Sequence, residues 1–360
     1  MVDRVVLHIG TMKTGTSYLQ RVLDTGILES VGGFYAGGSF RGQARAVDSL
    51  FHEKRREPRP WLALAERVRG REGTAVYSHE FLSFASEEKV RWIVESFGGV
   101  PVEVLLTVRD QRTAIPAQWQ SYVRNRGTDS WDSYVRALDS LRGRRRGRRA
   151  DHSQAARTFR RSQGVPGIIR RWAAQPSVSA VGVVVMPVPG SPPELLWQRF
   201  CEAADLPAPA PPATLERQNE SLGYASCEFL RRLNPWLADL GRLEYERSRR
   251  APVQTLLTLR HREARPVLDR HGSALAGELN ARILQAVDRH AARLVGSPTE
   301  LPAADDGGEP ATIPPADPDQ LRRAAQLVWE TCVPGSAAPS GDVEDLVPEL
   351  GRRLAARFGP

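Results

Sequence analysis

The sequence predicts an α/β protein whose central parallel sheet is covered by helices on both faces, with a helical extension at the C-terminal end. Apolar runs of strand length recur through the first half of the chain and alternate with amphipathic runs of helical length. Short joins between these runs favour parallel strands with helical crossovers. After residue 220 the patterns are helical only. A chain of 360 residues is long enough to bury a sizeable core.

The chain is organised around its first stretch, residues 4–20 (RVVLHIGTMKTGTSYLQ). Residues 4–9 are nearly all apolar, which is typical of a strand buried on both faces. Gly10 ends the strand, a small polar run follows, and Thr16 or Ser17 is placed to cap a helix. Such a turn presents several backbone N–H groups and the positive end of a helix dipole. It therefore favours a phosphate group.

The spacing in this loop is similar to a Walker A motif but departs from it at the lysine. Gly10 and Gly15 have the spacing of the glycine pair, whereas the next residue, Thr16, stands where the motif has lysine. The lysine comes three places earlier, as Lys13. Only three lysines occur in the chain against forty-seven arginines, which indicates a specific role for this one.

The rest of the first two thirds alternates between strand and helix patterns. Further strands are expected at residues 32–36, 73–78, 101–108 and 180–186, the last being the final core strand. Helices are expected at residues 43–51, 60–69, 87–97, 112–125, 131–141, 165–174 and 192–204. Right-handed crossovers would bring the loops after the strands to one edge of the sheet. That edge would gather Lys13, His79, Glu80 and Arg109.

Beyond this region the sequence predicts helices and linkers. Helices are expected at residues 220–233, 254–268, 275–294, 320–331 and 343–358, after a proline-rich linker at residues 207–212. We expect four consecutive regions: an α/β domain at 1–234 with a basic loop inserted at 142–161, a helical part at 235–296, a flexible linker at 297–319 and a short helical tail at 320–360.

The net charge of +8 is concentrated in one segment. Residues 142–161 contain nine arginines and a single acid, so the remainder of the chain is close to neutral. We therefore assign the basicity to a loop, and we expect no nucleic-acid partner. An RNA-binding role for residues 142–149 stays an alternative.

The cysteine and hydropathy patterns indicate the cellular setting of the protein and bear on metal binding and membrane insertion. Three widely spaced cysteines have no metal-site spacing, and their use favours a reducing, cytoplasmic setting. No stretch approaches 18 apolar residues, so no membrane insertion is expected. No HExxH motif and no carboxylate cluster indicates a metal. The oligomeric state cannot be read from the sequence.

A second motif, TVRDQRTAIPAQWQS at residues 107–121, follows another expected strand. The strand delivers Arg109 to its C-terminal end and so points a permanent cation at the ligand edge. A structural ion pair between Arg109 and Asp110 is the alternative. No Walker B aspartate is evident on this strand, which argues against a Mg²⁺-dependent kinase.

A third motif, YSHEFL at residues 77–82, places His79 and Glu80 at a strand end. A histidine can act as a general base near neutral pH, whereas a glutamate serves as one when it is desolvated. Because its neutral form needs no shift, His79 is the preferred base. On an extended strand Glu80 would point to the opposite face, and a role of the pair in helix capping is the alternative.

The stretch HIGTMKTGTSYLQ resembles the 5′-phosphosulfate-binding loop of sulfotransferases that use 3′-phosphoadenosine-5′-phosphosulfate (PAPS). It is most similar to their bacterial, carbohydrate-type branch, and the resemblance covers roughly residues 4–233. It implies a P-loop NTPase-like three-layer sandwich, PAPS as co-substrate and no metal. The loop residues expected to contact PAPS are Thr11, Met12, Lys13, Thr14, Gly15, Thr16 and Ser17.

The same resemblance implies further contacts. The arginine after the second motif's strand, here Arg109, would pair with the 3′-phosphate. A serine eight residues later is expected in the family, but position 117 is alanine, and Ser121 lies one helical turn further on. Arg217 and Asn219 would belong to a loop that closes over the nucleotide, and a plain helix N-cap at Asn219 or Ser221 is the alternative. Residues 156–172 would line the acceptor site or form a surface loop and a core helix.

The expected activity is therefore transfer of the sulfuryl group of PAPS to a hydroxyl or amine of an acceptor by in-line displacement. The acceptor would be a small molecule or a carbohydrate. Lys13 would neutralise charge on the leaving oxygen, with His79 or Glu80 as base. A P-loop small-molecule kinase and a catalytically inactive nucleotide- or RNA-binding protein are the alternatives. A plain strand–turn–helix corner is the structural alternative for the loop.

Overall fold

A computed structural model describes most of the chain, which forms two compact units. The described residues are 1–52, 58–142, 153–213, 215, 221–303, 309–339 and 342–359. The units interleave along the sequence, whereas the sequence predicts consecutive regions. The first unit comprises Met1–Ala114, Arg160–Arg217 and Ala276–Ala304, and the second comprises Ile115–Phe159, Gln218–Leu275 and Asp305–Pro360.

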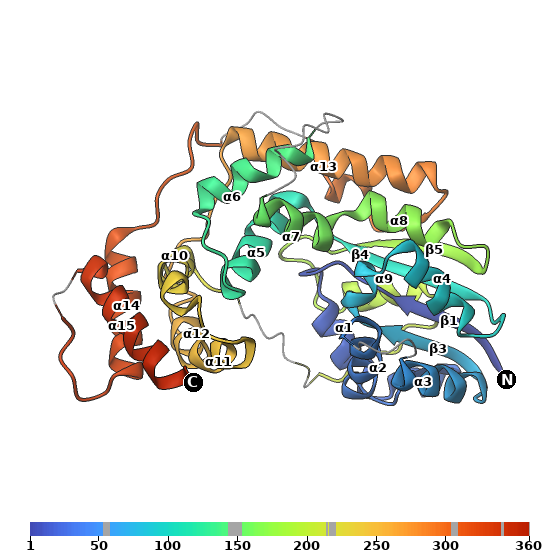
Figure 1. Cartoon of the computed structure of the whole chain (residues 1–360). Helices are drawn as coiled ribbons and strands as arrows, with labels where there is room; N and C mark the ends of the chain where they lie inside the picture. The colour runs from blue at the N-terminus through green and yellow to red at the C-terminus, as the bar shows by residue number, and fades with distance from the viewer. Residues whose placement is uncertain are drawn as a thin grey trace. The chain divides into compact units, whose positions relative to one another are not determined.

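The first unit is built on a six-stranded sheet in which every pairing is parallel. This confirms the predicted α/β class with a parallel central sheet (Figure 1). The strands are β1 (Val2–His8), β2 (Gly33–Tyr35), β3 (Gly73–Ser78), β4 (Val102–Val108), β5 (Val178–Val185) and β6 (Arg293–Val295). Their order across the sheet is β2-β3-β1-β4-β5-β6.

The strand order changes direction at β1. After β1 the chain builds β2 and β3 on one side, then crosses over β1 and builds β4, β5 and β6 on the other side. The loops that leave β1 and β4 therefore start out in opposite directions along the sheet. In open parallel sheets this is the place, at the carboxyl ends of the strands, where ligands bind. The β1–α1 loop lies at that point.

Helices cover both faces of this sheet. One face packs against α2 (Phe40–His52), α3 (Arg59–Arg69), α4 (Glu87–Glu95), α8 (Val165–Ala173) and the second half of α13 (Arg270–Arg289). The other face packs against α1 (Thr16–Leu23) and α9 (Leu195–Ala203). Alternation along β1 divides the strand between the two cores, since Val5 and Leu7 belong to the first and Val6 to the second.

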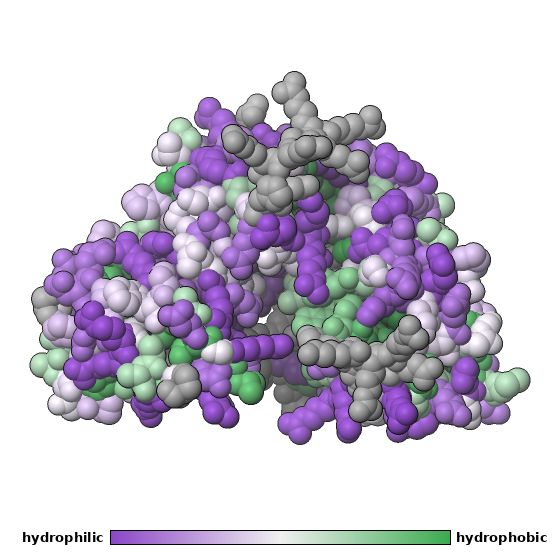
Figure 2. Space-filling model, in the orientation of Figure 1, coloured by the Kyte–Doolittle hydropathy of each residue, from purple (hydrophilic) through white to green (hydrophobic). Residues whose placement is uncertain are grey.

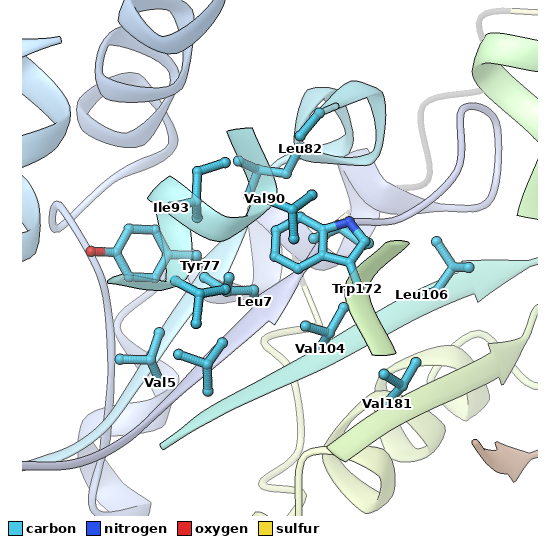
Figure 3. Close-up of a cluster of buried hydrophobic side chains, with 14 of the residues drawn as sticks. Val5, Leu7, Tyr77, Leu82, Val90, Ile93, Val104, Leu106, Trp172 and Val181 are labelled. Atoms are coloured by element: carbon cyan, nitrogen blue, oxygen red, sulfur yellow. The ribbon is translucent and has the colours of Figure 1, made fainter. Parts of the chain in front are cut away.

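The first of these cores is large and apolar. Figure 3 shows side chains from the strands, among them Leu7, Tyr77 and Leu106, meeting Val90 of α4 and Trp172 of α8. All five are at most 1% exposed. Burial of this kind contributes about 1.5–3 kcal/mol per large side chain, so this face anchors the sheet.

The second unit is helical. It contains α6 (Trp131–Ala137), α10 (Tyr224–Leu233), α11 (Arg242–Ser248), α12 (Arg250–Leu257), α14 (Pro318–Cys332) and α15 (Val343–Phe358). Helix α14 packs against α10, α12 and α15. The unit boundaries fall inside α5 (Gln111–Arg124), α7 (Gln154–Gln163) and α13.

Several expected elements differ from the structure. Residues 180–186 are not the last strand, because β6 follows α13 and pairs with β5. The expected helix at 275–294 runs instead from Arg270 to Arg289, and Ala291 then adopts a left-handed φ of 49°, which ends the helical path. Helices α7 and α11 were not predicted, and the helix expected at 254–268 ends at Leu257.

Some sequence predictions lie outside the described residues. These are residues 143–152 of the basic loop expected at 142–161, Arg217, Asn219 and part of the linker at 297–319. Among the helices that are described, none is both long and apolar enough to cross a membrane. Figure 2 shows hydrophilic residues over most of the face that it draws.

Candidate functional site

The loop between β1 and α1 adopts a backbone path that ordinary residues rarely take. Gly10, Lys13 and Gly15 have positive φ angles of 42°, 66° and 83°. A Cβ on Gly10 would lie 2.6 Å from Thr16 Cγ2, and a Cβ on Gly15 would lie 2.4 Å from Leu196 Cδ2. Both glycines therefore adopt a backbone conformation that other residues rarely take, and each lies close against a neighbouring side chain. Lys13 is not a glycine, so its left-handed backbone is an outlier of the kind that clusters at binding sites.

The loop ends at the N-terminus of α1. Gly15 is the N-cap residue and supplies no side-chain hydrogen bond to the first turn. The first N–H groups of a helix have no acceptor within the helix, and they carry the positive end of its dipole. Thr16 is buried and Ser17 is exposed at this end. The arrangement leaves donors and positive potential where the sequence predicted an anion.

Two side chains from other elements hold the loop by its carbonyl groups. Arg109 Nη1 donates to the Lys13 carbonyl at 3.1 Å, while Arg109 Nε donates to Thr113 Oγ1 at 2.9 Å. Gln163 Nε2, at the end of α7, donates to the Met12 carbonyl at 2.7 Å. The Arg109 cation thus lies directly beside the loop, as the second motif predicted.

Asp110 has its own partners in the structure. Its Oδ1 accepts from Asn280 Nδ2 at 2.7 Å and from the Arg112 backbone N–H at 3.0 Å. Asn280 lies on α13 and also bonds the Pro302 carbonyl. The carboxylate therefore ties the start of α5 to α13, and Arg109 is directed toward the loop by Thr113.

A buried row of polar side chains lies beneath the loop, and sequence reasoning missed it. His8 Nδ1 is 2.8 Å from Ser78 Oγ, and His8 Nε2 is 3.2 Å from Thr107 Oγ1. Thr107 Oγ1 is 2.7 Å from Thr14 Oγ1, which donates to the Thr11 carbonyl at 2.6 Å. Burial lowers the pKa of His8 to about 3, so the imidazole is neutral. The signal was present: β1 and β3 each end in a polar residue, and the last residue but one of β4 is polar as well.

His79 is held in a way that limits its use as a base. It is 4% exposed, stacks on Phe40 at 5.5 Å between ring centroids and contacts Phe81 at 5.0 Å. Its Nδ1 accepts from the Phe81 backbone N–H at 3.2 Å, capping a short 3-10 turn. Burial lowers its pKa, against the opposing effects of Glu80 and Asp48. A neutral ring that accepts at Nδ1 carries its proton on Nε2. Its lone pair is therefore already engaged.

Glu80 lies at the same edge and contacts the helix that follows the loop. Strand β3 ends at Ser78, and Glu80 opens the 3-10 turn Glu80–Phe84, so strand alternation does not decide where it points. The half-buried carboxylate accepts from Gln20 Nε2 of α1 at 3.1 Å. The nearby Tyr35 hydroxyl is buried without a hydrogen-bond partner in the described part of the chain. Burial raises the Tyr35 pKa, and Asp24 and Glu80 raise it further.

The remaining expected site residues are Ser121, Arg217 and Asn219. Ser121 lies on α5 in the second unit, where its backbone carbonyl accepts from Asn125. Arg217 and Asn219 lie outside the described residues. Within the described ranges, no three His, Cys, Asp or Glu side chains are grouped so that they could hold a metal ion.

Comparison with protein families, curated proteins and solved structures finds no match for this chain. The site must therefore be interpreted from its own chemistry. It combines helix N-terminal N–H groups, an ammonium on the loop, a guanidinium beside the loop and a carboxylate one strand away. This arrangement can bind an anionic group and place a proton acceptor near it.

Proposed function

We propose that this protein is a sulfotransferase that moves the sulfuryl group of PAPS to a hydroxyl or amine of a small-molecule or carbohydrate acceptor. The observation that carries the proposal is the β1–α1 loop. It joins a left-handed Lys13 and an uncapped helix N-terminus at the point where the strand order reverses. Lys13 stands three places before the Walker A position, which is the feature that resembles the sulfotransferase loop.

The loop would bind the 5′-phosphate end of PAPS. The backbone N–H groups of Thr14 and Gly15, with those of Thr16 and Ser17, would supply hydrogen bonds to phosphate oxygens. In the transfer, the acceptor oxygen forms a bond to sulfur while the bond from sulfur to the 5′-phosphate oxygen breaks. Lys13 neutralises the charge that develops on that departing oxygen. Arg109 would pair with the 3′-phosphate.

For the base, the geometry favours Glu80, and we revise the preference for His79 accordingly. The lone pair on His79 Nδ1 is engaged by the Phe81 N–H, and taking a proton would break that cap. Glu80 is oriented by Gln20 and lies on the segment that follows β3. A proton from the acceptor hydroxyl would pass to the Glu80 carboxylate as the new oxygen–sulfur bond forms.

A thermal-shift panel tests the proposal. Adenosine 3′,5′-bisphosphate without Mg²⁺ should stabilise the protein by about 2.7 kcal/mol at 100 times its Kd, and more than AMP does at equal concentration. The variant Arg91→Ala loses an exposed arginine of α4 that lies away from the loop. It should respond to each nucleotide as the wild-type protein does. Stabilisation by ATP with Mg²⁺ alone would replace the proposal with a kinase. No response to any adenine nucleotide would overturn it.

Activity can be tested without knowing the acceptor. The protein is incubated with PAPS carrying a labelled sulfuryl group and a panel of phenols, sugars and amines. Release of adenosine 3′,5′-bisphosphate that depends on one acceptor class would support the proposal and name that class. Arg91→Ala again serves as the control, and Lys13→Ala should remove the acceptor-dependent release.

A further inference from the structure

On the face that packs against α1 and α9, three neighbouring strands change from apolar to polar residues near their carboxyl ends. Val6, Val76 and Leu105 belong to the apolar core of that face. Two residues further along each strand, on the same face, stand His8, Ser78 and Thr107. His8 and Ser78 are paired in the sheet register, and all three are 0% exposed.

The directions of the hydrogen bonds in this row follow from donor counting. Thr14 has one hydroxyl proton and gives it to the Thr11 carbonyl, which can only accept. Thr14 Oγ1 must then accept from the Thr107 hydroxyl. Thr107 Oγ1 must in turn accept from His8, which places the imidazole proton on Nε2.

The same reasoning completes the other half of the row. With its proton on Nε2, His8 Nδ1 is an acceptor, and its neighbour, the Ser78 hydroxyl, is the donor. From Ser78 to the Thr11 carbonyl, each group therefore donates its hydrogen bond to the next group along the row. A chain of this kind is satisfied by one tautomer of a neutral histidine and no other.

We infer that His8 is a positioning residue whose neutral Nε2–H tautomer joins the anion-binding loop, through Thr107 and Thr14, to the β3 end that carries the candidate base. The inference rests on the proposed function for its consequence in catalysis, but not for the network itself. It assigns a role to a histidine that does not touch the reacting groups.

On the loop side, the network fixes the strained backbone before any ligand binds. The Thr14 hydroxyl closes the turn onto Thr11, and Thr11 is held against β4 because its N–H and its hydroxyl both donate to the Thr107 carbonyl at 3.1 Å. Gly10 leaves room for this row, since a Cβ there would lie 3.3 Å from Thr107 Oγ1 and 3.5 Å from His8 Nε2. A loop held in this way does not need the ligand to order it.

On the β3 side, the network ends one residue before the candidate bases. Gln20 of α1 donates from the same Nε2 to the Ser78 carbonyl and to the Glu80 carboxylate, both at 3.1 Å. The backbone N–H of Ser78 donates to Gln43 Oε1 at 2.8 Å. Ser78 is thus fixed at its hydroxyl, carbonyl and N–H. A displacement of His8 would therefore be transmitted to Glu80 through Ser78 and Gln20.

Amide hydrogen exchange tests the coupling without a ligand. Thr14→Val keeps the shape and removes the hydroxyl, and it should raise exchange of the amides in residues 11–17 about fivefold. The inference further requires a rise in residues 79–84, across the His8 connection. Thr14→Ser restores the hydroxyl and should return both segments to wild-type rates.

The control and the contradicting outcome are well defined. Thr74→Val removes another buried threonine hydroxyl from β3, at the opposite end of the strand, and should leave both segments unchanged. A rise confined to residues 11–17 in Thr14→Val would overturn the coupling, and so would an equal rise in Thr74→Val.

A spectroscopic measurement tests the tautomer directly. The ¹⁵N shifts of the His8 ring at neutral pH should show a protonated Nε2 and an unprotonated Nδ1. Thr107→Val removes the acceptor of the Nε2 proton and should shift the Nε2 signal, whereas Thr107→Ser should not. The opposite tautomer, or a charged ring, would contradict the inference.

Turnover measurements then separate this inference from the proposed function. Thr14→Val and Ser78→Ala should each lower kcat more than they raise KM, and their effects on kcat should be non-additive because they share His8. Additive effects would refute the coupling even if sulfuryl transfer is observed. If no transfer is observed in wild type, the proposed function fails, and the exchange and NMR results still decide the network.

Discussion

The two faces of the central sheet end differently at the edge where the loop lies. On the face covered by α4 and α8, the strands remain apolar to their ends, as Leu7, Tyr77 and Leu106 show. On the face covered by α1, the matching positions are His8, Ser78 and Thr107. Burying polar groups is costly unless each is hydrogen-bonded. The difference teaches that the first face is built for packing and the second for holding a loop.

The largest expected effect is on the packing face. Trp172→Ala removes a fully buried side chain and should lower the free energy of unfolding by about 3–5 kcal/mol. Urea unfolding measures this. Leu243→Ala, on a side chain that is 62% exposed, is the control and should change stability by about 0.5 kcal/mol or less. Because the polar row that closes the loop lies on the other face, bisphosphate affinity of the folded Trp172→Ala protein should stay unchanged. A loss of affinity would show that the faces are not separate.

The loop itself should show the opposite pattern. Lys13→Ala should raise the activation free energy of turnover by about 3–4 kcal/mol, because the ammonium acts on charge that develops only in the transition state. Its affinity for adenosine 3′,5′-bisphosphate should change by only a few-fold, and its stability should stay close to wild type. Steady-state kinetics and calorimetric titration measure these quantities. Turnover within about threefold of wild type would remove Lys13 from its assigned role.

The base can be assigned by comparing two variants. Glu80→Gln should lower kcat/KM by about a hundredfold, because it removes the proposed proton acceptor. His79→Gln should leave kcat/KM and its dependence on pH close to those of wild type. Since burial lowers the pKa of His79, a limb due to the imidazole would lie below the ordinary histidine range. A limb that disappears in His79→Gln and persists in Glu80→Gln would restore His79 as the base.

A smaller effect is expected from the guanidinium beside the loop. Arg109→Ala should weaken bisphosphate binding by about 1.5–3 kcal/mol, the worth of a charge-assisted hydrogen bond. It should also reduce the preference for adenosine 3′,5′-bisphosphate over AMP. Arg91→Ala is the matched control. Unchanged discrimination between the two nucleotides would rule out the 3′-phosphate contact.

The polar face should also make stability sensitive to acid. The pKa of His8 is lowered to about 3, whereas an unfolded histidine titrates near 6.5, so below that pH the unfolded chain binds one more proton. Stability should therefore fall as the pH drops, by about 1.4 kcal/mol per unit for this residue. His79, whose pKa is also lowered, contributes in the same direction. In His8→Gln, the slope of the unfolding free energy against pH should be smaller by the contribution of one proton. Equal slopes in the two proteins would contradict a neutral, buried His8.

The central strands could be predicted because their sequences decide their structure. Strands β1, β3 and β4 are apolar runs of the right length, and burial on both faces leaves them no other place in the fold. Strand β6 has only three residues and begins with exposed Arg293, so it gives no pattern to detect. It forms because the chain leaving α13 passes beside β5. That is a tertiary contact, which sequence periodicity does not record.

The site was predictable in its parts and less so in its geometry. Lys13 and Arg109 could be singled out because a loop lysine is rare in this arginine-rich chain and a strand end delivers the arginine. The choice between His79 and Glu80 depended on the Phe81 backbone N–H, which donates to His79 Nδ1. Sequence patterns do not show this hydrogen bond. His8 was visible as a polar residue at a strand end. Its meaning required knowing that β3 and β4 both lie beside β1.

The central claim is that the β1–α1 loop binds the 5′-phosphate end of the nucleotide. Amide hydrogen exchange of the full chain, with and without adenosine 3′,5′-bisphosphate, tests it most directly. Exchange of the amides in residues 13–17 should slow on binding, because these N–H groups would donate to phosphate oxygens. Sodium chloride at the same ionic strength serves as the control for salt effects. Saturating bisphosphate that leaves residues 13–17 unprotected, while it protects another segment, would contradict the account.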